Sequence, residues 1–534
     1  MTSGLPFHPE QPVNPACEVS ALENLVQQGW RQPHIETSFI TTLPAAERFS
    51  DVRFDWNRLL EKDPEQQLTG WLFLKLLALI YFAAFCSLSV QINGLAGPGG
   101  ILPFEELLNN AERSMGASAW LRLPTLFWID AGDTALLGAT ILGMLLSVLL
   151  FLNIRPRLSL LLMFLLYLSL FHAGQIFMSF QWDYLLMETG LLALFVVGGP
   201  SRLVIFMFHW LLFRLRFLSG ISKLLSGDPT WSGMTALNYY FETQPLPHAG
   251  AWYAHQLPEW MLQAGVGLTF FAELVVPFFI FLPRRFRLFA AGVTILIQLL
   301  IIATSNHNFI NLLTILLCLF LLDDRIVGRL LPGRIRKRIG QDTHAERRQG
   351  IGVVVVSAVI LSASIPGAVG LSLNTRLPDT LQNWMIQVSH FGVGNVYHIF
   401  PTMQTERQEL IIEGSNDSVN WYPYLFRYKP HELDRRPPVN IPHQPRLDWM
   451  IWFVPPRSPE NLYWFDRFMH NLWTGNPRVT GLLRYNPFPH RPPRYLRVLV
   501  YRYKFTTDKE REITGNWWKA EYLGQFHEVA PRRP

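Results

Sequence analysis

The sequence predicts a polytopic α-helical membrane domain followed by an exoplasmic, mixed α/β C-terminal domain that contains a sheet. Three observations lead to this fold class. Hydrophobic residues make up 49% of the 534 residues and charged residues only 16%, whereas a soluble domain carries about 25% charged residues. Apolar runs of membrane-spanning length recur up to residue 372. Beyond that point the sequence becomes polar, aromatic and proline-rich, which indicates a second domain.

The predicted membrane domain covers residues 71–372 and follows a polar, cytosolic N-terminal segment, residues 1–70. A spanning helix needs about 20 mostly apolar residues, although tilted or kinked helices depart from this length. About nine spans are predicted, eight or nine being expected because the fourth and eighth runs are short: 71–91, 133–153, 158–178, 184–198, 203–223, 263–283, 287–303, 308–322 and 351–370.

Arginine and lysine predict the orientation, because these residues concentrate in cytosolic connections. With the N-terminus in the cytosol and nine crossings, every basic connection between spans falls on the cytosolic side: Arg155 and Arg157, Arg202, the cluster at 284–287, and the long connection 323–350. Three polar and aromatic connections, at 179–183, 227–260 and 305–308, then lie on the exoplasmic side together with the tail.

The tail, residues 373–534, is predicted to form a mixed α/β module. Strands are expected at 408–415, 421–429 and 496–507, where β-branched and aromatic residues alternate with polar ones. The segment 459–475 has the apolar periodicity of a helix. A tail of this length is long enough to bury a core of its own.

Motifs of soluble enzymes do not occur in the sequence. It contains no phosphate-binding loop, no dinucleotide fingerprint, no GxSxG and no HExxH. The 15 histidines and 3 cysteines lack metal-ligand spacing, so neither a metal nor another cofactor is expected. Basic residues of the tail are mixed with acids and prolines, which argues against a nucleic-acid partner. The sequence carries no signal for an oligomeric state.

Ionisable residues inside predicted spans are the candidates for chemistry, because charges in a bilayer are costly and usually serve a purpose. Glu188, Glu273 and Lys223 are the catalytic candidates, and Arg214 and Arg216 lie near them in sequence. Mutual neutralisation between packed helices is the favoured interpretation, since structural ion pairs often resemble active sites. A direct chemical role is the alternative.

The exoplasmic stretch "GDPTWSGMTALNYYFETQPLP", residues 227–247, has two interpretations. Asp228 is expected to cap a helix that begins near Trp231, and the prolines hold "QPLP" extended. The aromatic side chains of this stretch and of Trp252 then form either an aromatic belt at the membrane surface or a surface that grips an exposed apolar segment of another protein.

The tail sequence "PHQPRLDWMIWF", residues 442–453, also allows two interpretations. In the favoured one, Arg446 pairs with Asp448 while Trp449 and Trp452 fill the core, because tryptophan is usually largely buried. In the other, the tryptophans line a contact surface.

Several long segments resemble the lipase maturation factor family. The membrane part contains "SFQWDYLLMETG" (179–190), "FLSGISKLLSGDPTW" (217–231) and "YYFETQPLPHAGAWYAHQLP" (239–258). The tail contains "NVYHIFPTMQTERQELIIEGS" (395–415), "PHQPRLDWMIWF", "LLRYNPF" (482–488), "YRYKF" (501–505) and "GNWWK" (515–519). The match extends over almost the whole chain from about residue 71.

The resemblance implies a multi-pass membrane protein that assists folding and assembly of secreted lipases. Its C-terminal domain would lie in the endoplasmic reticulum lumen, or in the periplasm if the chain is bacterial and sits in the cytoplasmic membrane. The candidate client-binding or signature residues are those of the matched segments: Trp182, Asp183, Asp228, Trp231, Tyr240, Glu242, Thr243, Gln244, Pro245, Trp252, Arg446, Asp448 and Trp449.

The chain departs from the family at two positions. Animal members carry a cysteine near the position of Thr230, and this chain has none there, so cysteine-dependent chemistry is not transferred to it. Arg216 stands where the family would have an apolar residue.

Two hypotheses follow from the sequence. The first is a maturation factor without a chemical step, whose partners are the bilayer and a secreted client such as a lipase. The second is a membrane enzyme that uses a lipid or quinone cofactor, because Lys223 followed by "LLSGDPTW" is distantly similar to the vitamin K-dependent carboxylase family. Lys223 would then be the base, and it would need a pKa depressed by burial.

Overall fold

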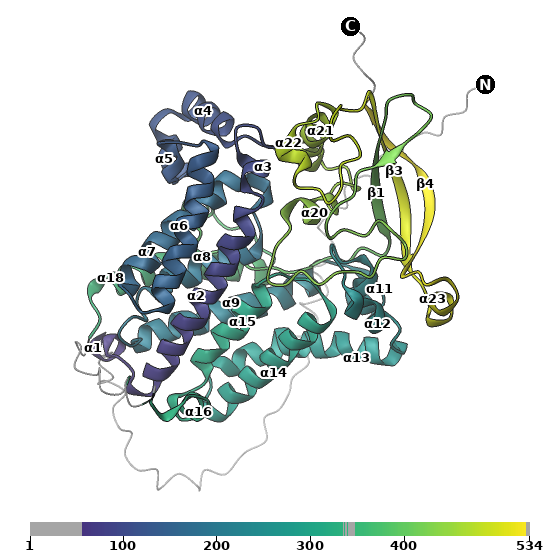
Figure 1. The fold of residues 1–534 in the computed structure, drawn as a ribbon. Helices are drawn as coiled ribbons and strands as arrows, with labels where there is room; N and C mark the ends of the chain where they lie inside the picture. Colours follow the sequence, from purple (N-terminus) through teal and green to yellow (C-terminus); the bar gives the residue numbers. More distant parts are fainter. Residues whose placement is uncertain (1–55, 335, 337–338, 340–347, 530–534) are drawn as a thin grey trace, which may run out of the picture. The chain divides into compact units, whose positions relative to one another are not determined.

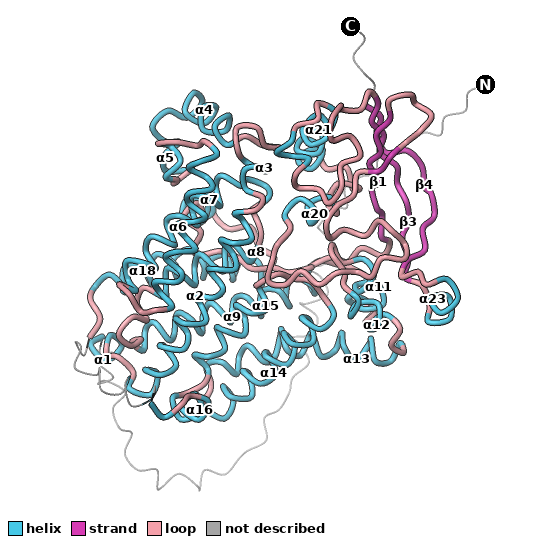
Figure 2. The backbone as a smooth tube through the Cα atoms, viewed as in Figure 1, coloured by secondary structure: helices cyan, strands magenta, loops and turns pink. Residues whose placement is uncertain are grey.

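The computed structural model describes residues 56–529, apart from 335, 337–338 and 340–347. The predicted cytosolic segment 1–70 therefore lies largely outside the described residues, and so does part of the basic connection 323–350. Residues from Trp56 onward form one compact unit. Figures 1 and 2 show a helical chain whose strands are confined to its C-terminal part.

Seven helical segments are long and apolar enough to cross a membrane among the described residues. They are Pro64–Ser89 (with α2, Gln67–Ser89), Asp133–Phe151 (α6), Pro156–Phe177 (with α7, Pro156–Gly174), Arg202–Leu225 (α9), Glu259–Phe281 (beginning with α13, Glu259–Phe270), Arg284–Thr304 (α14) and Ile351–Ser372 (α18). This confirms a multi-pass helical domain.

The two short predicted spans are also helical but fall below spanning length. They are α8, Gln181–Ala193, with 13 residues, and Ile310–Leu321, which begins with α15, Ile310–Leu317. At a rise of 1.5 Å per residue, α8 is about 20 Å long, against about 30 Å for the hydrocarbon core. Most side chains of both segments are buried among the longer helices.

Shorter helices connect the spans, and others belong to the C-terminal part. They are α1 (Trp56–Leu60), α3 (Ile92–Ala96), α4 (Phe104–Met115), α5 (Ala119–Arg122), α10 (Pro229–Ser232), α11 (Ala236–Thr243), α12 (Ala249–His255), α16 (Asp324–Leu330), α19 (Asp379–Ser389), α20 (Arg446–Ile451), α21 (Pro459–Trp473), α22 (Pro477–Thr480) and α23 (Asp508–Thr514).

The span Glu259–Phe281 changes helix type where Glu273 lies. After α13 the chain forms a π-helical turn, Phe271–Val275, and then a 3₁₀ turn, Val276–Phe281. Pro277 has no N–H to donate to the carbonyl of Glu273 four residues earlier, so the α-helical ladder cannot continue. Such π turns are frequent at functional sites.

The C-terminal part contains a four-stranded antiparallel sheet in the order β2-β1-β3-β4, formed by β1 (Arg407–Ser415), β2 (Tyr422–Pro423), β3 (Tyr495–Phe505) and β4 (Trp518–Val529). Leu410 and Val500 are partners in the register of β1 and β3. The predicted strands 408–415 and 496–507 and the predicted helix 459–475 are confirmed as β1, β3 and α21. The strand β4 was not among the predicted elements.

The predicted strand 421–429 is wrong over most of its length, since only Tyr422 and Pro423 belong to β2. Tyr424 and Phe426 are buried with the alternation that suggested a strand. The backbone of the following residues, however, donates to a carboxylate instead of a neighbouring strand.

The sheet and the membrane helices share buried apolar clusters. Leu410, Val498 and Trp464 of the C-terminal part pack in one cluster with Leu95 and Phe177, which come from the connections flanking membrane helices. Hydrophobic contacts therefore hold the tail against the helical domain.

Candidate functional site

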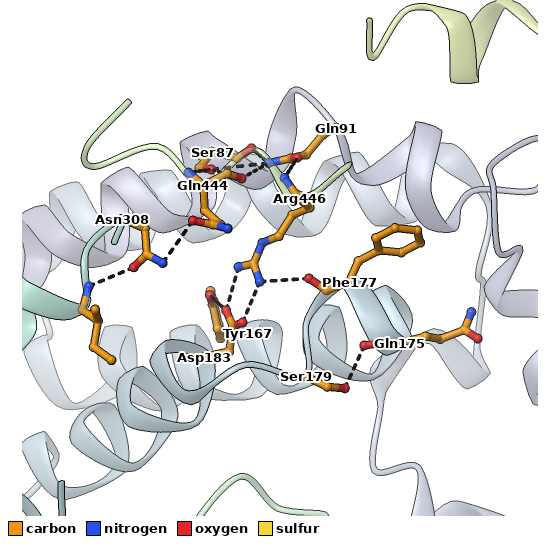
Figure 3. Close-up of polar contacts among 11 residues, drawn as sticks. Ser87, Gln91, Tyr167, Gln175, Phe177, Ser179, Asp183, Asn308, Gln444 and Arg446 are labelled. Carbon is orange, nitrogen blue, oxygen red and sulfur yellow. Dashed lines mark hydrogen bonds and ion pairs between the residues drawn. The ribbon is translucent and has the colours of Figure 1, made fainter. Parts of the chain in front are cut away.

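A buried ion pair joins the tail to the membrane domain. Asp183 lies in the first turn of α8 and Arg446 is the first residue of α20, with exposures of 0% and 1%. Arg446 Nη1 lies 2.6 Å from Asp183 Oδ2, and Nη2 lies 2.7 Å from Oδ1. The hydroxyl of Tyr167 donates to the same carboxylate at 2.6 Å. Figure 3 shows this bidentate pair, a geometry that adds both strength and orientation.

Amide side chains around the backbone of Arg446 extend this contact between the tail and the membrane domain, which we call the first junction. The backbone N–H of Arg446 donates to Gln91 Oε1 at 2.9 Å, while Gln91 Nε2 donates to the carbonyl of Gln444 at 2.8 Å. Asn308 Nδ2 donates to Gln444 Oε1 at 3.1 Å, and Ser87 contributes its hydroxyl (Figure 3). Polar groups from three distant parts of the chain thus satisfy most of one another's hydrogen bonds, in keeping with their burial.

The predicted pairing of Arg446 with Asp448 is wrong. Asp448 Oδ1 accepts the backbone N–H groups of Tyr428 (2.6 Å) and Lys429 (3.0 Å). Residues two apart on a helix do not face each other, so Arg446 reaches α8 while Asp448 binds the backbone of a loop. Burial raises the pKa of Asp448, and these N–H groups oppose the rise. Trp449 is 3% exposed, so its predicted burial is confirmed.

A second junction fixes the predicted signature residues Glu242, Thr243, Gln244 and Pro245. The guanidinium of Arg407 donates to the carbonyl oxygens of Gln244 and Pro245 and to that of Glu242. The carboxylate of Glu242 accepts the backbone N–H of Phe505 at 2.6 Å, and the carbonyl of Thr243 accepts Trp452 Nε1 at 2.7 Å. The stretch is therefore held against β1 and β3.

Arg407 was not among the sequence candidates, although a signal for it existed. Arg407 and Glu409 alternate along one strand and therefore share a face. Both are buried, and Glu409 also accepts from Lys429 at 2.6 Å. Burial alone would raise the pKa of Glu409, but the charges of Lys429 and Arg407 hold it below its ordinary value.

The structure buries Trp231 and Trp252, two of the aromatic residues considered for a belt or a gripping surface, whereas Tyr239 of the same stretch is 36% exposed. Trp252 is 1% exposed, and its Nε1 donates to the carbonyl of Thr506 at 2.9 Å. Trp231 is 4% exposed, and Tyr240 packs against His307 and Phe400. Trp231 and Trp252 are part of the interior and Tyr240 is partly buried, so a direct contact with a client would have to use exposed neighbours of the two tryptophans.

Asp228 caps a helix as predicted. Its Oδ1 accepts the backbone N–H of Thr230 at 2.8 Å at the start of α10, and its Oδ2 accepts the N–H of Met403 at 2.7 Å. Partial burial alone would raise the pKa of Asp228, but the hydrogen bonds from Thr230 and Met403 lower it. The carboxylate thereby links the membrane domain to the tail a third time.

The catalytic candidates of the spans lie in two buried charge clusters, one around Glu188 and one around Glu273, which contacts both Lys223 and Arg216. Glu188 pairs with Arg214, both with fully buried side chains, and also accepts from the N–H of Gly394 and the hydroxyl of Tyr397. Glu273 pairs with Lys223, whose Nζ lies 2.8 Å from Glu273 Oε2. The carboxylate of Glu188 has several donors around it and serves as an anchor for the tail.

A cavity of about 430 Å³ adjoins the second ion pair. It lies between the spans and the tail segment that follows α19. The structure brings six of the predicted residues to its wall: Trp182, Lys223, Trp231, Tyr240, Glu273 and Trp449. Trp182 and Trp449 meet edge to face, with ring centroids 5.1 Å apart. The wall also contains Arg216 and His307, which the site prediction had not included.

The lysine of this cavity has all its hydrogen-bonding capacity in use. Lys223 Nζ donates to the carbonyl of Ser219 at 3.1 Å, to Glu273 at 2.8 Å and to the carbonyl of Ile399 at 2.8 Å. Three acceptors match the three donors of an ammonium group. In the part of the chain that the structure describes, no cluster of three or more His, Cys, Asp or Glu could hold a metal ion.

These features define a multi-pass helical membrane protein with a sheet domain fastened onto its helices by buried ion pairs. The family model for the lipase maturation factor transmembrane domain matches residues 68–329, and that for the lipase maturation factor C-terminal domain matches residues 393–528. The chain belongs to the lipase maturation factor family, which confirms the resemblance.

Two groups of relatives illustrate the similarity. Lipase maturation factor 2 of Xenopus laevis is 33% identical over 584 residues, covering 86% of this chain and 82% of the relative. Lipase maturation factor 1 of Mus musculus is 32% identical over 506 residues, covering 86% of each. No solved structure matches the chain.

Proposed function

We propose that this protein is a membrane-bound maturation factor for secreted lipases that acts by binding its client, without a chemical step of its own. The relatives that cover most of the chain carry the name lipase maturation factor. The observation that carries the proposal is the pair of Arg446 and Asp183, which fastens the tail to the membrane domain. A fixed tail can hold a partly folded client at a constant position beside the membrane and suppress its aggregation.

The proposal places the tail on the exoplasmic side. The N-terminal end of α9 lies with basic connections, since the N–H of Arg202 donates to the carbonyl of Glu61, whose backbone also bridges Arg348. The other end of α9 lies with the tail, through Lys223 and Ile399. Because arginine-rich connections favour the cytosol, the opposite end and the tail attached to it belong on the exoplasmic side.

The alternative, a membrane enzyme with Lys223 as its base, has less support from the geometry. A base must present a lone pair to the substrate, whereas Lys223 has three acceptors around its nitrogen. These contacts favour an ammonium that holds Glu273 and the tail in place.

A rescue assay tests the proposal. The chain is expressed in cells that lack their own lipase maturation factor, and the activity of a secreted lipase is measured per mass of lipase protein. We expect rescue by the wild-type chain and by Lys223→Arg, which keeps the positive charge. Failure of the wild-type chain to rescue would refute the role, and loss of rescue by a stably folded Lys223→Arg would favour the enzyme.

The client-binding surface is tested at exposed aromatic residues beside the buried stretch. Tyr253 and Trp260 are 56% and 68% exposed. Replacing both by serine should reduce lipase rescue severalfold without lowering the thermal stability of the membrane protein. Leu330, which is 72% exposed beside the basic connections, supplies the control, and Leu330→Ser should leave rescue unchanged. Equal rescue by all variants would show that these loops are not part of the client-binding surface.

A further inference from the structure

The cavity beside Lys223 is lined by N–H groups that have no acceptor among the described residues. Five lining residues carry them: Trp182, Trp231 and Trp449 through Nε1, Asn311 through Nδ2, and Arg216 through both Nε and Nη2. All five side chains belong to residues at most 6% exposed. Buried donors without partners are uncommon and costly in native proteins. So many on one wall indicate that acceptor oxygens belong in the cavity. The amide oxygen of Gln181 is the unpartnered acceptor on the same wall.

The charge of the cavity favours an anion. Its charged lining residues are Arg216, Lys223 and Glu273. Burial lowers the pKa of His307 to about 4, so that this ring is neutral at neutral pH. Two cations and one carboxylate leave one net positive charge, and Lys223 already has three acceptors.

Arg216 is the cation of this cavity with donors left unpaired. Its contact with Glu273 is long, 3.5 Å between Nη1 and Oε1. The Nε and Nη2 groups share the opposite edge of the planar guanidinium and are both free. Two parallel N–H groups of this kind hold the two oxygens of a carboxylate or phosphate.

Much of the remaining wall is apolar. Leu215, Ile310, Phe400 and Phe453 are among the lining residues, together with four tryptophans. The volume of about 430 Å³ lies within the range of small-molecule sites. An inorganic ion would leave this apolar surface uncovered, whereas a molecule with an anionic head and a hydrocarbon body would match both parts of the wall.

We propose that the cavity binds an amphipathic anion of the membrane, a fatty acid or an anionic phospholipid, whose head-group oxygens pair with Arg216 and accept from the indole N–H groups. The ligand fills the space between the spans and the tail. This role is separate from the binding of a client, because the lining residues named here are buried.

Photoreactive lipids test this proposal on the purified full-length protein in detergent. Three probes are compared: photoreactive oleate, photoreactive phosphatidic acid and, as a neutral reference, photoreactive oleyl alcohol. We expect the wild-type protein to be labelled by at least one anionic probe more strongly than by the alcohol. Labelling by oleate alone identifies a fatty acid, and labelling by phosphatidic acid alone identifies a phospholipid head group.

Substitutions at two arginines of α9 locate the site. Arg216→Met should lower anionic labelling about tenfold, since it removes the charged bidentate contact. Arg202→Met, at the exposed beginning of the same helix, is the matched control and should label like the wild-type protein. Arg216→Lys keeps the charge but lacks the planar fork and should restore only part of the labelling.

Two results would overturn the proposal. One is labelling of the wild-type protein by the alcohol that equals labelling by both anionic probes, including the case in which no probe labels it, because the cavity would then not select an anionic head group. The other is unchanged anionic labelling in Arg216→Met with an unaltered melting temperature. If Arg216→Met does not fold, Trp231→Phe removes a single donor while keeping an aromatic ring. It should weaken anionic labelling severalfold, and unchanged labelling would equally contradict the proposal.

Discussion

Replacing Arg446 by methionine should uncouple the tail from the membrane domain. Methionine keeps an unbranched apolar chain but removes both bonds to Asp183, at 2.6 and 2.7 Å, and the bond from Nη1 to the carbonyl of Phe177 at 3.0 Å. Asp183 would remain 0% exposed, with the hydroxyl of Tyr167 as its strongest remaining donor.

The expected loss of unfolding free energy in Arg446→Met follows from the burial of both Arg446 and Asp183. Removing one member of a buried ion pair leaves an uncompensated charge and costs about 3–5 kcal/mol. Replacing both members by apolar residues removes that charge as well, so the double variant Arg446→Met with Asp183→Leu should lose far less than the sum of the single variants. The coupling free energy between the two positions should be about 3 kcal/mol.

The assay is guanidinium unfolding of the detergent-solubilised protein, followed by tryptophan fluorescence. Arg467 supplies a matched control, because it pairs with Glu106 across the same two parts of the chain at 2.9 Å but is 32% exposed. Arg467→Met should cost no more than about 1 kcal/mol, as exposed pairs do. A loss below about 1 kcal/mol for Arg446→Met, or additive losses in the double variant, would refute the reasoning.

Two further variants, one of them with a matched control, test the junction with β1 and the packing of the spans. Glu409→Gln should cost about 3 kcal/mol at neutral pH, by leaving Lys429 and Arg407 buried without their carboxylate. Because the folded pKa of Glu409 is lowered, its contribution is present above the ordinary pKa of about 4.3 and is lost as pH falls through the folded value. The difference in unfolding free energy between wild type and variant should therefore shrink below pH of about 4, and a constant difference would contradict this. Gly220→Ala should cost about 1–3 kcal/mol, since an added Cβ would lie 2.8 Å from a side chain of the facing π-helical turn. Gly138→Ala, where nothing lies within 4 Å, should be neutral or slightly stabilising in the same guanidinium unfolding assay.

The membrane domain could be predicted from local properties of the sequence. Each of the nine apolar runs is helical, because a run of such residues satisfies its backbone within one segment. The change in composition after residue 372 also predicted the tail, and the alternation of apolar and polar residues predicted β1 and β3. The strand β4 was missed although Trp518, Ala520 and Tyr522 alternate with exposed Lys519 and Glu521, which is the periodicity of a strand.

The candidate site was predicted only in part. Lys223 and Glu273 were recognisable as charges within apolar runs, and their pairing agrees with mutual neutralisation. That Trp231 and Trp449 share a cavity with them depends on how the tail packs against the spans. The spacing of residues along the chain does not predict that packing.

By itself the sequence determined the number and order of the apolar segments, the change to a sheet-containing tail and the family. These properties depend on composition and on short-range periodicity. Only the tertiary structure decided that Arg446 pairs with Asp183 rather than with its neighbour Asp448. It also decided that the aromatic stretch is covered and that Arg216 keeps an unpartnered edge. The physical reason is that a buried charge or indole is satisfied by whichever groups surround it in space, and these come from segments far apart in the chain.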